Sequence, residues 1–228
     1  MKLKPYYKPV LNLLDDDHYN AILDVPCGKG WLACLLDDTK TIDGADASDF
    51  AANKYRKFFK IDFNESLPLE DSSYDAVVSC EGLEHMGNPL LFLKECRRIL
   101  RIGGQLIVTT PNIWYPGARC KFLINGFFPS FPAITSEFEV MNHKHLIPWS
   151  PPQLYLFLKL AGFSEIEQFA REEQSPKRRW ERALVWILKG YVARRYNRAK
   201  TDDERQFWET MKVNQGLAGR GLIFKAIA

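Results

Sequence analysis

The feature that most constrains the fold is a regular alternation of short apolar segments with helix-like segments across residues 21–110. The expected strands are apolar throughout rather than at every second residue, which is typical of parallel strands buried on both faces. They cover residues 21–25, 41–46, 59–63, 74–80 and 105–110. This alternation predicts a doubly wound α/β fold of the Rossmann-like class, with a mostly parallel sheet.

Helical segments are expected between these strands. Residues 31–36 are apolar with a helical spread, and residues 49–58 follow Ser48, a candidate N-cap. Residues 89–100 carry apolar side chains at three- and four-residue spacing, which predicts an amphipathic helix. This helix should end at Gly103–Gly104, because glycine is typical just beyond a helix C-terminus.

The second half of the chain has a different texture. Residues 113–150 are rich in aromatic residues, proline and glycine, and predict a long irregular insertion, which is usually functional at this length. We expect a helix over 153–160, a strand over 163–169, a basic helix within 175–200 and a last strand over 221–227. The core at 21–112, the insertion and the remaining segment 151–228 are expected to form one domain over 1–228.

Composition excludes several classes of protein. The chain is 46% hydrophobic and 26% charged, which is ordinary for a compact soluble domain and unlike a disordered or collagen-like chain. Its longest apolar runs, such as residues 183–188, are much shorter than the roughly 20 residues that span a bilayer. The first residues lack a signal-peptide pattern, and the five cysteines show no paired spacing. We therefore expect a cytoplasmic protein with reduced thiols.

Three polar features follow expected strands. The first is the tight turn at residues 24–30, where Gly28 and Gly30 allow a ligand to approach the backbone. The second is Asp46, where a carboxylate can accept both hydroxyls of a ribose. The third is Asp62–Phe63, placed to contact an adenine edge and stack on its face. Because ligands bind outside the carboxyl ends of open parallel sheets, these features predict a nucleoside site.

An ordered series of motifs resembles that of class I S-adenosylmethionine-dependent methyltransferases. The series consists of the turn at 22–30, the entry into the fourth strand at 67–78, Glu84–His85, the segment 95–104 and Thr110–Asn112. The resemblance is close over residues 21–112 and looser over 143–163. It implies that the chain binds S-adenosylmethionine and transfers its methyl group to an acceptor.

The resemblance also implies roles for individual residues. Asp24 and the backbone near Gly28 would hold the methionine end of the cofactor, Asp46 the ribose and Asp62 the adenine amino group, with Cys80 near the methionine moiety. The full set of implied cofactor-binding residues is Asp24, Pro26, Cys27, Gly28, Gly30, Asp46, Ala47, Asp62, Phe63 and Cys80.

Pro26 departs from the family pattern, which usually has a glycine at that position. Proline fixes φ near about −65° and lacks an N–H, so a positive-φ turn is excluded there and the turn must form in another way. This departure supports an alternative hypothesis, a methyltransferase-like scaffold that binds a nucleoside or a partner without catalysis. A nicotinamide enzyme shares the glycine pattern but gives no role to Asp24 or to the series from Gly103 to Asn112.

The expected catalytic residues are Glu81, Glu84 and His85, whose spacing would place them on one side of a helical turn. A hydroxyl acceptor must lose its proton to a general base or to a metal-bound group. The spacing looks like the metal-binding pattern of plant small-RNA 2′-O-methyltransferases and quinone-pathway O-methyltransferases, with His143 or His145 as a further ligand for a divalent metal. Metal-free relatives carry the same Glu–His pair, and we favour the metal-free interpretation.

Residues 175–200 contain nine basic residues and one acidic residue, together with aromatic and aliphatic side chains at helical spacing. The simplest interpretation is a helix with its apolar face on the sheet and its basic face in solvent. Peripheral contact with an anionic membrane is a second interpretation, and self-association a third. Nucleic acid is the least favoured partner, because the whole chain carries a net charge of only +3.

The expected activity is O-methylation of a small molecule, a sugar or a lipid-linked glycan by in-line displacement. The insertion, from Trp114 to Phe131, resembles that of methyltransferases that act on bacterial glycans and lipids. Its aromatic residues could stack on a sugar, cover a lipid chain or simply cover the core.

Overall fold

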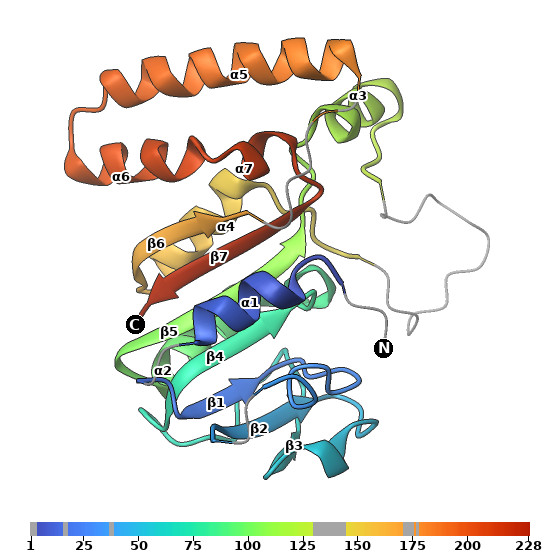
Figure 1. Cartoon of the computed structure of the whole chain (residues 1–228), viewed down its shortest axis with the longest axis vertical. Helices are drawn as coiled ribbons and strands as arrows, with labels where there is room; N and C mark the ends of the chain where they lie inside the picture. The colour runs from blue at the N-terminus through green and yellow to red at the C-terminus, as the bar shows by residue number, and fades with distance from the viewer. Residues whose placement is uncertain (1–3, 16–17, 37–38, 130–144, 171–175, 177) are drawn as a thin grey trace.

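The computed structural model describes residues 4–15, 18–36, 39–129, 145–170, 176 and 178–228 (Figure 1). They form a seven-stranded sheet in the order β3-β2-β1-β4-β5-β7-β6. Its strands are β1 (Ala21–Asp24), β2 (Thr41–Asp46), β3 (Phe58–Lys60), β4 (Tyr74–Cys80), β5 (Leu100–Pro111), β6 (Ser164–Phe169) and β7 (Gly221–Ile227). The first five strands pair in parallel, whereas β7 runs antiparallel to both β5 and β6. The predicted doubly wound, mostly parallel fold is confirmed.

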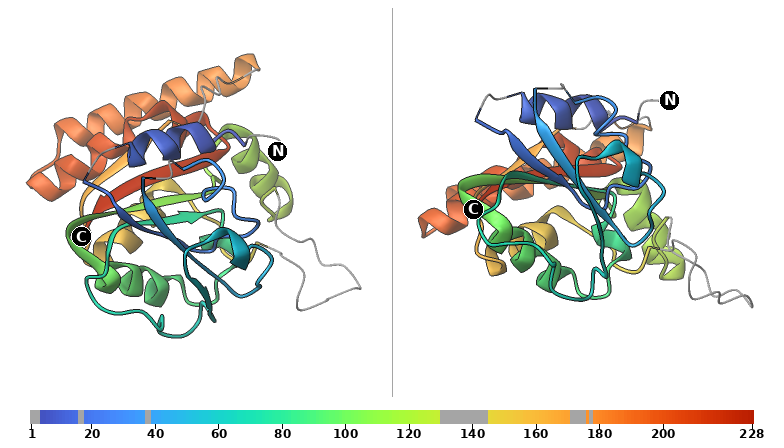
Figure 2. Two further views of the ribbon diagram at one scale, coloured as in Figure 1. Left: turned by 60° about the horizontal axis from the view of Figure 1, so that its bottom comes forward. Right: turned by 90° about the horizontal axis from the view of Figure 1, so that it is seen from below.

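Helices cover both faces of this sheet (Figure 2). They are α1 (Tyr7–Leu14), α2 (Pro89–Ile99), α3 (Pro116–Asn125), α4 (Pro151–Leu160), α5 (Arg179–Asn197), α6 (Asp202–Met211) and α7 (Asn214–Ala218). In β1, Ile22 belongs to the apolar cluster beneath α1, and its neighbour Leu23 to the cluster formed with α2 and α4. Successive residues of the strand are therefore buried on opposite faces, which explains its continuous apolar sequence. Among the described residues, no helix combines the length and hydropathy needed to cross a membrane.

Helix α2 matches the expected amphipathic helix but ends before the glycine pair. Its start is fixed by Asn88, whose side-chain oxygen accepts the N–H of Leu91 at 3.2 Å. At its end, the carbonyls of Arg98 and Ile99 accept backbone N–H groups from Ser72 and Ser73. Leu100 then pairs with Tyr74 as the first residue of β5. These bonds satisfy the final helix carbonyls without a glycine cap, so residues 100–104 extend the strand.

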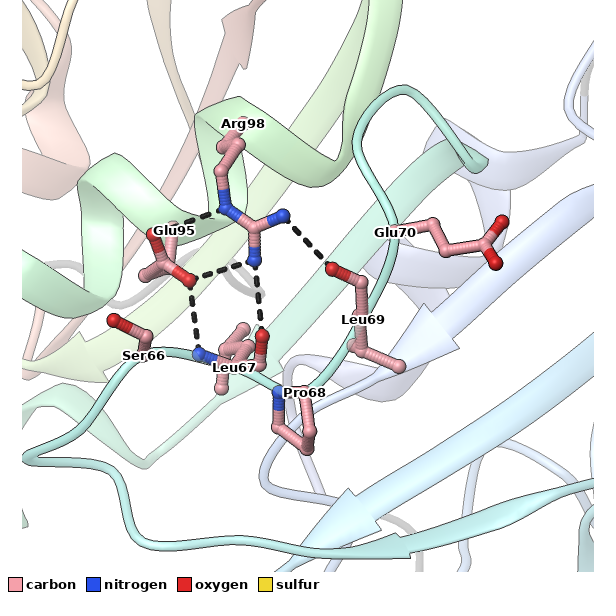
Figure 3. Close-up of a pocket in the computed structure, with 7 residues that line it drawn as sticks. All are labelled: Ser66, Leu67, Pro68, Leu69, Glu70, Glu95 and Arg98. Carbon is pink, nitrogen blue, oxygen red and sulfur yellow. Dashed lines mark hydrogen bonds and ion pairs between the residues drawn. The ribbon is translucent and has the colours of Figure 1, made fainter.

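The loop before β4 is held by a partly buried ion pair between Arg98 and Glu95 (Figure 3). Arg98 donates to Glu95 at 2.7 Å and to the carbonyls of Leu67 and Leu69, while Glu95 accepts the N–H of Leu67 at 2.9 Å. Hydrogen bonding from Arg98, the largest contribution, lowers the pKa of Glu95. These groups line a pocket of about 540 Å³. Because they bind one another, we assign them a structural role, positioning the entry into β4.

Two expected helices are absent from the described structure. Residues 31–36 form successive turns, and within 49–58 only Ala52–Lys54 is helical, as a single 3₁₀ turn. The helix over 49–58 is prevented because its last residues bond to β2, since Arg56 donates to the carbonyl of Ile42 and Gly44 donates to the carbonyl of Lys57. After these residues, β3 begins at Phe58 and ends at Lys60, earlier than the predicted strand over 59–63.

The insertion is partly helical rather than irregular. Helix α3 begins at Pro116, where the missing N–H of proline costs no hydrogen bond, and ends before Gly126, which has φ +73°. Residues 130–144 lie outside the described residues. The predicted segments 153–160 and 163–169 are confirmed as α4 and β6, and 221–227 as β7.

The basic segment forms α5, as expected, but the helix packs mainly against α6, with further contacts to α3 and α7. Val185 and Val192 are buried in one apolar cluster with Met211 of α6 and Leu217 of α7. The expected packing of its apolar face on the sheet is therefore wrong, because α6 and α7 lie between α5 and the sheet (Figure 1).

Candidate active site

The predicted cofactor residues gather where β1, β2 and β4 end. Asp24 is the last residue of β1, Asp46 the last of β2 and Cys80 the last of β4. The three strands are neighbours in the sheet and run in the same direction. Their carboxyl ends therefore meet at one edge, where open α/β sheets bind ligands.

Asp24 is a buried carboxyl group with one hydrogen-bonded oxygen. The hydroxyl of Tyr55 donates to its Oδ2 at 2.7 Å, and within the described residues its Oδ1 has no hydrogen-bond partner. Burial raises the pKa of Asp24 to about 7, the bond from Tyr55 opposes this rise, and the charge of Asp46 adds to it. A buried acceptor atom of this kind fits a ligand that brings a cationic donor.

The turn after β1 forms in spite of Pro26. The Val25–Pro26 peptide bond is cis, and the positive backbone angles fall on Gly28 (φ +52°) and Gly30 (φ +71°). Asp46 binds this turn, because its Oδ2 accepts the N–H of Gly28 at 2.8 Å and its Oδ1 accepts the N–H of Ser48 at 3.0 Å. The turn therefore forms in another way, as predicted: the left-handed backbone conformation occurs at Gly28 and Gly30 and not at Pro26.

The turns after β1 and β4 are in direct contact. A Cβ added to Gly82 would lie 2.4 Å from Cδ of Pro26, so only glycine fits beside this proline. The preceding residue, Glu81, has φ +54°, and its Oε1 accepts the hydroxyl of Thr109 at 3.2 Å. The structure therefore brings Glu81 and Pro26 to the same edge of the sheet.

The other predicted cofactor residues are distributed around this edge. Oδ1 of Asp62 accepts the backbone N–H and the side-chain amide of Asn64, at 2.8 and 3.0 Å. Phe63 packs edge-on against Phe92 with ring centroids 6.1 Å apart. Ala47 is exposed. Cys27 is buried, and burial raises the pKa of its thiol to about 12, which keeps it neutral and unsuited to act as a nucleophile.

Two tyrosines at this edge are missing from the sequence predictions. The ring of Tyr55 covers Gly44 so closely that a Cβ there would lie 2.6 Å from it. Tyr7 of α1 stacks on Trp31 with ring centroids 4.0 Å apart, and burial followed by the charges of Cys80 and Asp24 raises its pKa. Gly44 within a strand was an available signal for close packing, but the sequence did not show what packs there.

A second cluster combines Glu84, His85 and His145. Oε1 of Glu84 lies 3.9 Å from Nε2 of His85 and 4.0 Å from Nε2 of His145, and the two rings pack edge to face. Glu84 is buried, and its Oε2 accepts the hydroxyl of Thr110 at 3.0 Å. The segment after His145 is fixed because the N–H of Leu146 donates to the carbonyl of Glu84 at 2.6 Å.

The cluster holds only part of the predicted catalytic and metal sets. Among the described residues, the ligand atoms of Glu84, His85 and His145 lie within 4.8 Å of one another. Glu81 is not in that group, because the chain forms a 3₁₀ turn at Leu83–His85 and the side chain of Glu81 binds Thr109. His143 lies outside the described residues. Burial, and then the charge of His85, lowers the pKa of His145, which favours its neutral imidazole.

Comparison with known proteins gives a consistent family. Residues 23–108 match the methyltransferase domain family. A Mycolicibacterium smegmatis protein, named as a probable S-adenosylmethionine-dependent methyltransferase, is 34% identical over 97 residues, covering 40% of this chain and 38% of that protein. The ubiquinone biosynthesis O-methyltransferase of Maricaulis maris is 29% identical over 162 residues, covering 66% and 57%. Other relatives are named tRNA U34 carboxymethyltransferases. The chain spans less than two thirds of the length of these relatives.

A solved structure agrees over almost the whole chain. The S-adenosylmethionine-dependent methyltransferase of Mesorhizobium loti has a TM-score of 0.58 at 15% identity, covering 99% of this chain and 98% of that one. This likeness concerns the fold, whereas the match at residues 23–108 concerns the sequence around the carboxyl edge of the sheet. Together with the ordered motifs, these matches support the class I S-adenosylmethionine-dependent methyltransferase superfamily as the family that the chain resembles, which implies S-adenosylmethionine as its cofactor.

Proposed function

We propose that this chain transfers the methyl group of S-adenosylmethionine to a hydroxyl oxygen of a small molecule, a sugar or a lipid-linked glycan. The observation that carries the proposal is the cluster of Glu84, His85 and His145, in which Glu84 and His85 follow β4 shortly after the proposed cofactor residue Cys80. A carboxylate with two imidazoles is a set of groups able to take a proton from a hydroxyl.

The residues around the carboxyl edge fit the cofactor. The free lone pairs on the buried Oδ1 of Asp24 suit the cationic amino group of a methionine moiety. The turn at Gly28 is open on its outer side, since nothing lies within 4 Å of the position of a Cβ there. Asp46 and Asp62 would accept the ribose hydroxyls and the adenine amino group, with Phe63 beside the ring. The cofactor supplies a methyl group on a positively charged sulfur.

In this proposal the cluster of Glu84, His85 and His145 removes the proton of the acceptor hydroxyl. His85 is the general base, because its imidazole is partly exposed while Glu84 is buried. When the cofactor is bound and its methyl group passes from sulfur to the acceptor oxygen, the imidazole of His85 would take the hydroxyl proton. Glu84, fixed by Thr110, stabilises the resulting imidazolium. His145 packs edge to face against His85 and stays neutral, because burial lowers its pKa.

The same three side chains are the candidate ligands of a divalent metal. A carboxylate with two imidazoles suits zinc or manganese, and such an ion would lower the pKa of a bound hydroxyl. We favour the metal-free role of His85, because an imidazole beside the carboxylate of Glu84 can take the proton without a metal. Activity that survives complete chelation would support this choice. Activity that is lost on chelation and restored only by added zinc or manganese would show that a bound metal ion, and not His85 as the base, promotes loss of the proton.

The name of one relative supports an oxygen acceptor. One relative is a ubiquinone biosynthesis O-methyltransferase, and others are named for tRNA U34. In this chain, the guanidinium of Arg119 lies 4.3 Å above the ring of Trp114, near the start of the predicted insertion over residues 113–150. Such an aromatic and cationic pair suits the face of a sugar or a phosphate-bearing acceptor better than a duplex.

Calorimetric titration with S-adenosylhomocysteine tests the cofactor site first. Micromolar binding that is lost in Asp46→Ala and retained in Ile102→Ala, an exposed control residue at the start of β5, supports the proposal. Failure to bind would favour the alternative of a catalytically inactive scaffold. Acceptor screening then compares the full chain with His85→Gln. A rate unchanged in that variant, with a hydroxyl acceptor in hand, would exclude His85 as the base.

A further inference from the structure

Helix α5 presents large apolar side chains on its outward side. A surface helix normally turns its apolar stripe toward the core and its polar face toward solvent. Here Val185 and Val192 already face the core, yet Trp186 is 76% exposed and Ile187 58% exposed. Trp180 and Tyr191 are also exposed and, with Ile187, follow one side of the helix at seven- and four-residue intervals.

Positive charge borders this apolar stripe. Between residues 178 and 200 there are eight exposed basic side chains, those of Arg178, Arg179, Arg182, Lys189, Arg194, Arg195, Arg198 and Lys200. The single acidic residue in this range, Glu181, accepts the N–H of Arg178 and so serves the helix start. Arg182 and Lys189 lie seven residues apart on one edge of the stripe, and Arg195 lies near the other edge, where its guanidinium covers the ring of Trp208.

The end of α3 continues the apolar surface. Leu123 is 86% exposed and Ile124 is 83% exposed, and both precede the turn at Gly126. Helix α3 lies beside the N-terminal end of α5 (Figure 1). Ile124 and Trp180 line one cavity of about 870 Å³ between the two helices, together with Lys121, Arg178 and Arg220. The two exposed helix faces are therefore adjacent, and the cavity between them is lined by three basic side chains and one acidic one, that of Glu181.

We propose that the outward face of α5 and the end of α3 form a docking surface for an anionic lipid bilayer. Tryptophan, tyrosine and isoleucine suit the boundary between headgroups and acyl chains. Long basic side chains at the edges of the stripe can reach lipid phosphates while their methylene stems stay on the apolar surface. The basic cavity between α3 and α5 would accept a phosphate-bearing headgroup. An anionic bilayer matches both features of the surface, its apolar side chains and the positive charge around them.

Charge on the neighbouring helix does not oppose this orientation. Helix α6 begins with three acidic residues, but Asp203 pairs with Lys159 of α4 at 3.2 Å, and Glu204 accepts the backbone N–H of Lys200 at 2.8 Å. Two of these three acids therefore serve contacts within the protein. A bilayer lying on α5 would therefore meet a surface of predominantly positive charge.

Co-sedimentation of the full chain with vesicles tests the proposal. The probes are vesicles of phosphatidylcholine alone and vesicles in which about a third of the lipid is phosphatidylglycerol. We expect binding to the anionic vesicles only, weakened by added salt. The variants Trp186→Ala with Ile187→Ala, and Arg182→Gln with Lys189→Gln, should each weaken binding by about tenfold or more. Ile102→Ala, a variant of a residue that is 94% exposed elsewhere on the molecule, should leave binding unchanged.

Each variant should fold, because every substituted side chain is exposed in the wild type, and melting curves check this. The proposal is overturned by the absence of binding to anionic vesicles, by equal binding to both vesicle types, or by equal loss in Ile102→Ala. Binding of a mixed-sequence oligonucleotide that depends on Arg182 and Lys189 but not on Trp186 would assign the face to nucleic acid. A dimer in sedimentation velocity that dissociates in the Trp186 and Ile187 variant would assign it to a second copy.

Discussion

Asp24→Asn should make the protein progressively more stable than the wild type as the pH rises. The carboxyl of Asp24 is buried, and its pKa rises from 3.8 in the unfolded chain to about 7 in the folded protein. A raised carboxyl pKa means that the folded state binds the proton more tightly, so the contribution of Asp24 to stability is greatest below pH 3.8, falls as the pH rises to about 7, and is level above that.

The size of the effect follows from the pKa difference. A shift of about three units at roughly 1.4 kcal/mol per unit corresponds to about 4 kcal/mol of stability lost across this range. Asparagine cannot ionise, so the free-energy difference between the variant and the wild type should grow by about that amount. Asparagine also buries an amide that needs a partner, at a cost of roughly 1–3 kcal/mol that does not depend on pH.

Urea denaturation followed by tryptophan fluorescence, at several values between about pH 4 and pH 8, measures this difference. Tyr55→Phe serves as the matched variant, because it removes the hydrogen bond that lowers the pKa of Asp24 and should extend the fall in stability to higher pH. If the difference between Asp24→Asn and the wild type is the same at both ends of the range, then the buried carboxyl is not the source of the pH dependence and the reasoning fails.

Three further predictions concern neighbouring groups. Gly82→Ala should destabilise the protein by about 1–3 kcal/mol through its clash with Pro26, and a double-mutant cycle with Pro26→Ala should recover part of that loss; additive effects would contradict the contact. Gly44→Ala should displace the ring of Tyr55 and weaken S-adenosylhomocysteine binding in calorimetry more than Tyr55→Phe does, and a smaller effect would show that the ring position is unimportant. In an NMR titration, His145 should have a midpoint below 6.5, and a midpoint above it would contradict its burial beside His85.

The strands of the core could be predicted because their sequence carries its own burial pattern. Residues 74–80 are apolar on both faces and stand between turn-forming residues, and they form β4 with the expected bounds. The expected helix over 49–58 failed for a reason that lies elsewhere in the chain. Its last residues pair with β2, and Tyr55 turns inward to bind Asp24. A local apolar spread cannot reveal such long-range bonds.

The candidate site was only partly predictable for the same reason. Asp24, Asp46 and Cys80 follow strands, and parallel pairing is sufficient to bring strand ends together. His145 joins Glu84 through backbone hydrogen bonds from residues 146 and 147 to a carbonyl some sixty residues earlier, a contact without a local signature. The spacing of Glu81, Glu84 and His85 predicted one face of a helix, but the left-handed backbone at Glu81 separates its side chain from the other two.

The position of β7 has a consequence for synthesis on the ribosome. Within the described sheet, β6 pairs only with β7, and β7 also pairs with β5. Helices α5, α6 and α7 lie between β6 and β7 in the chain. While these helices emerge from the exit tunnel, β6 remains unpaired, because β7, the strand that joins it to the sheet, has not yet been made. The nascent chain can thus assemble the first five strands early, whereas β6 acquires its place only when the last strand arrives between two segments made before it.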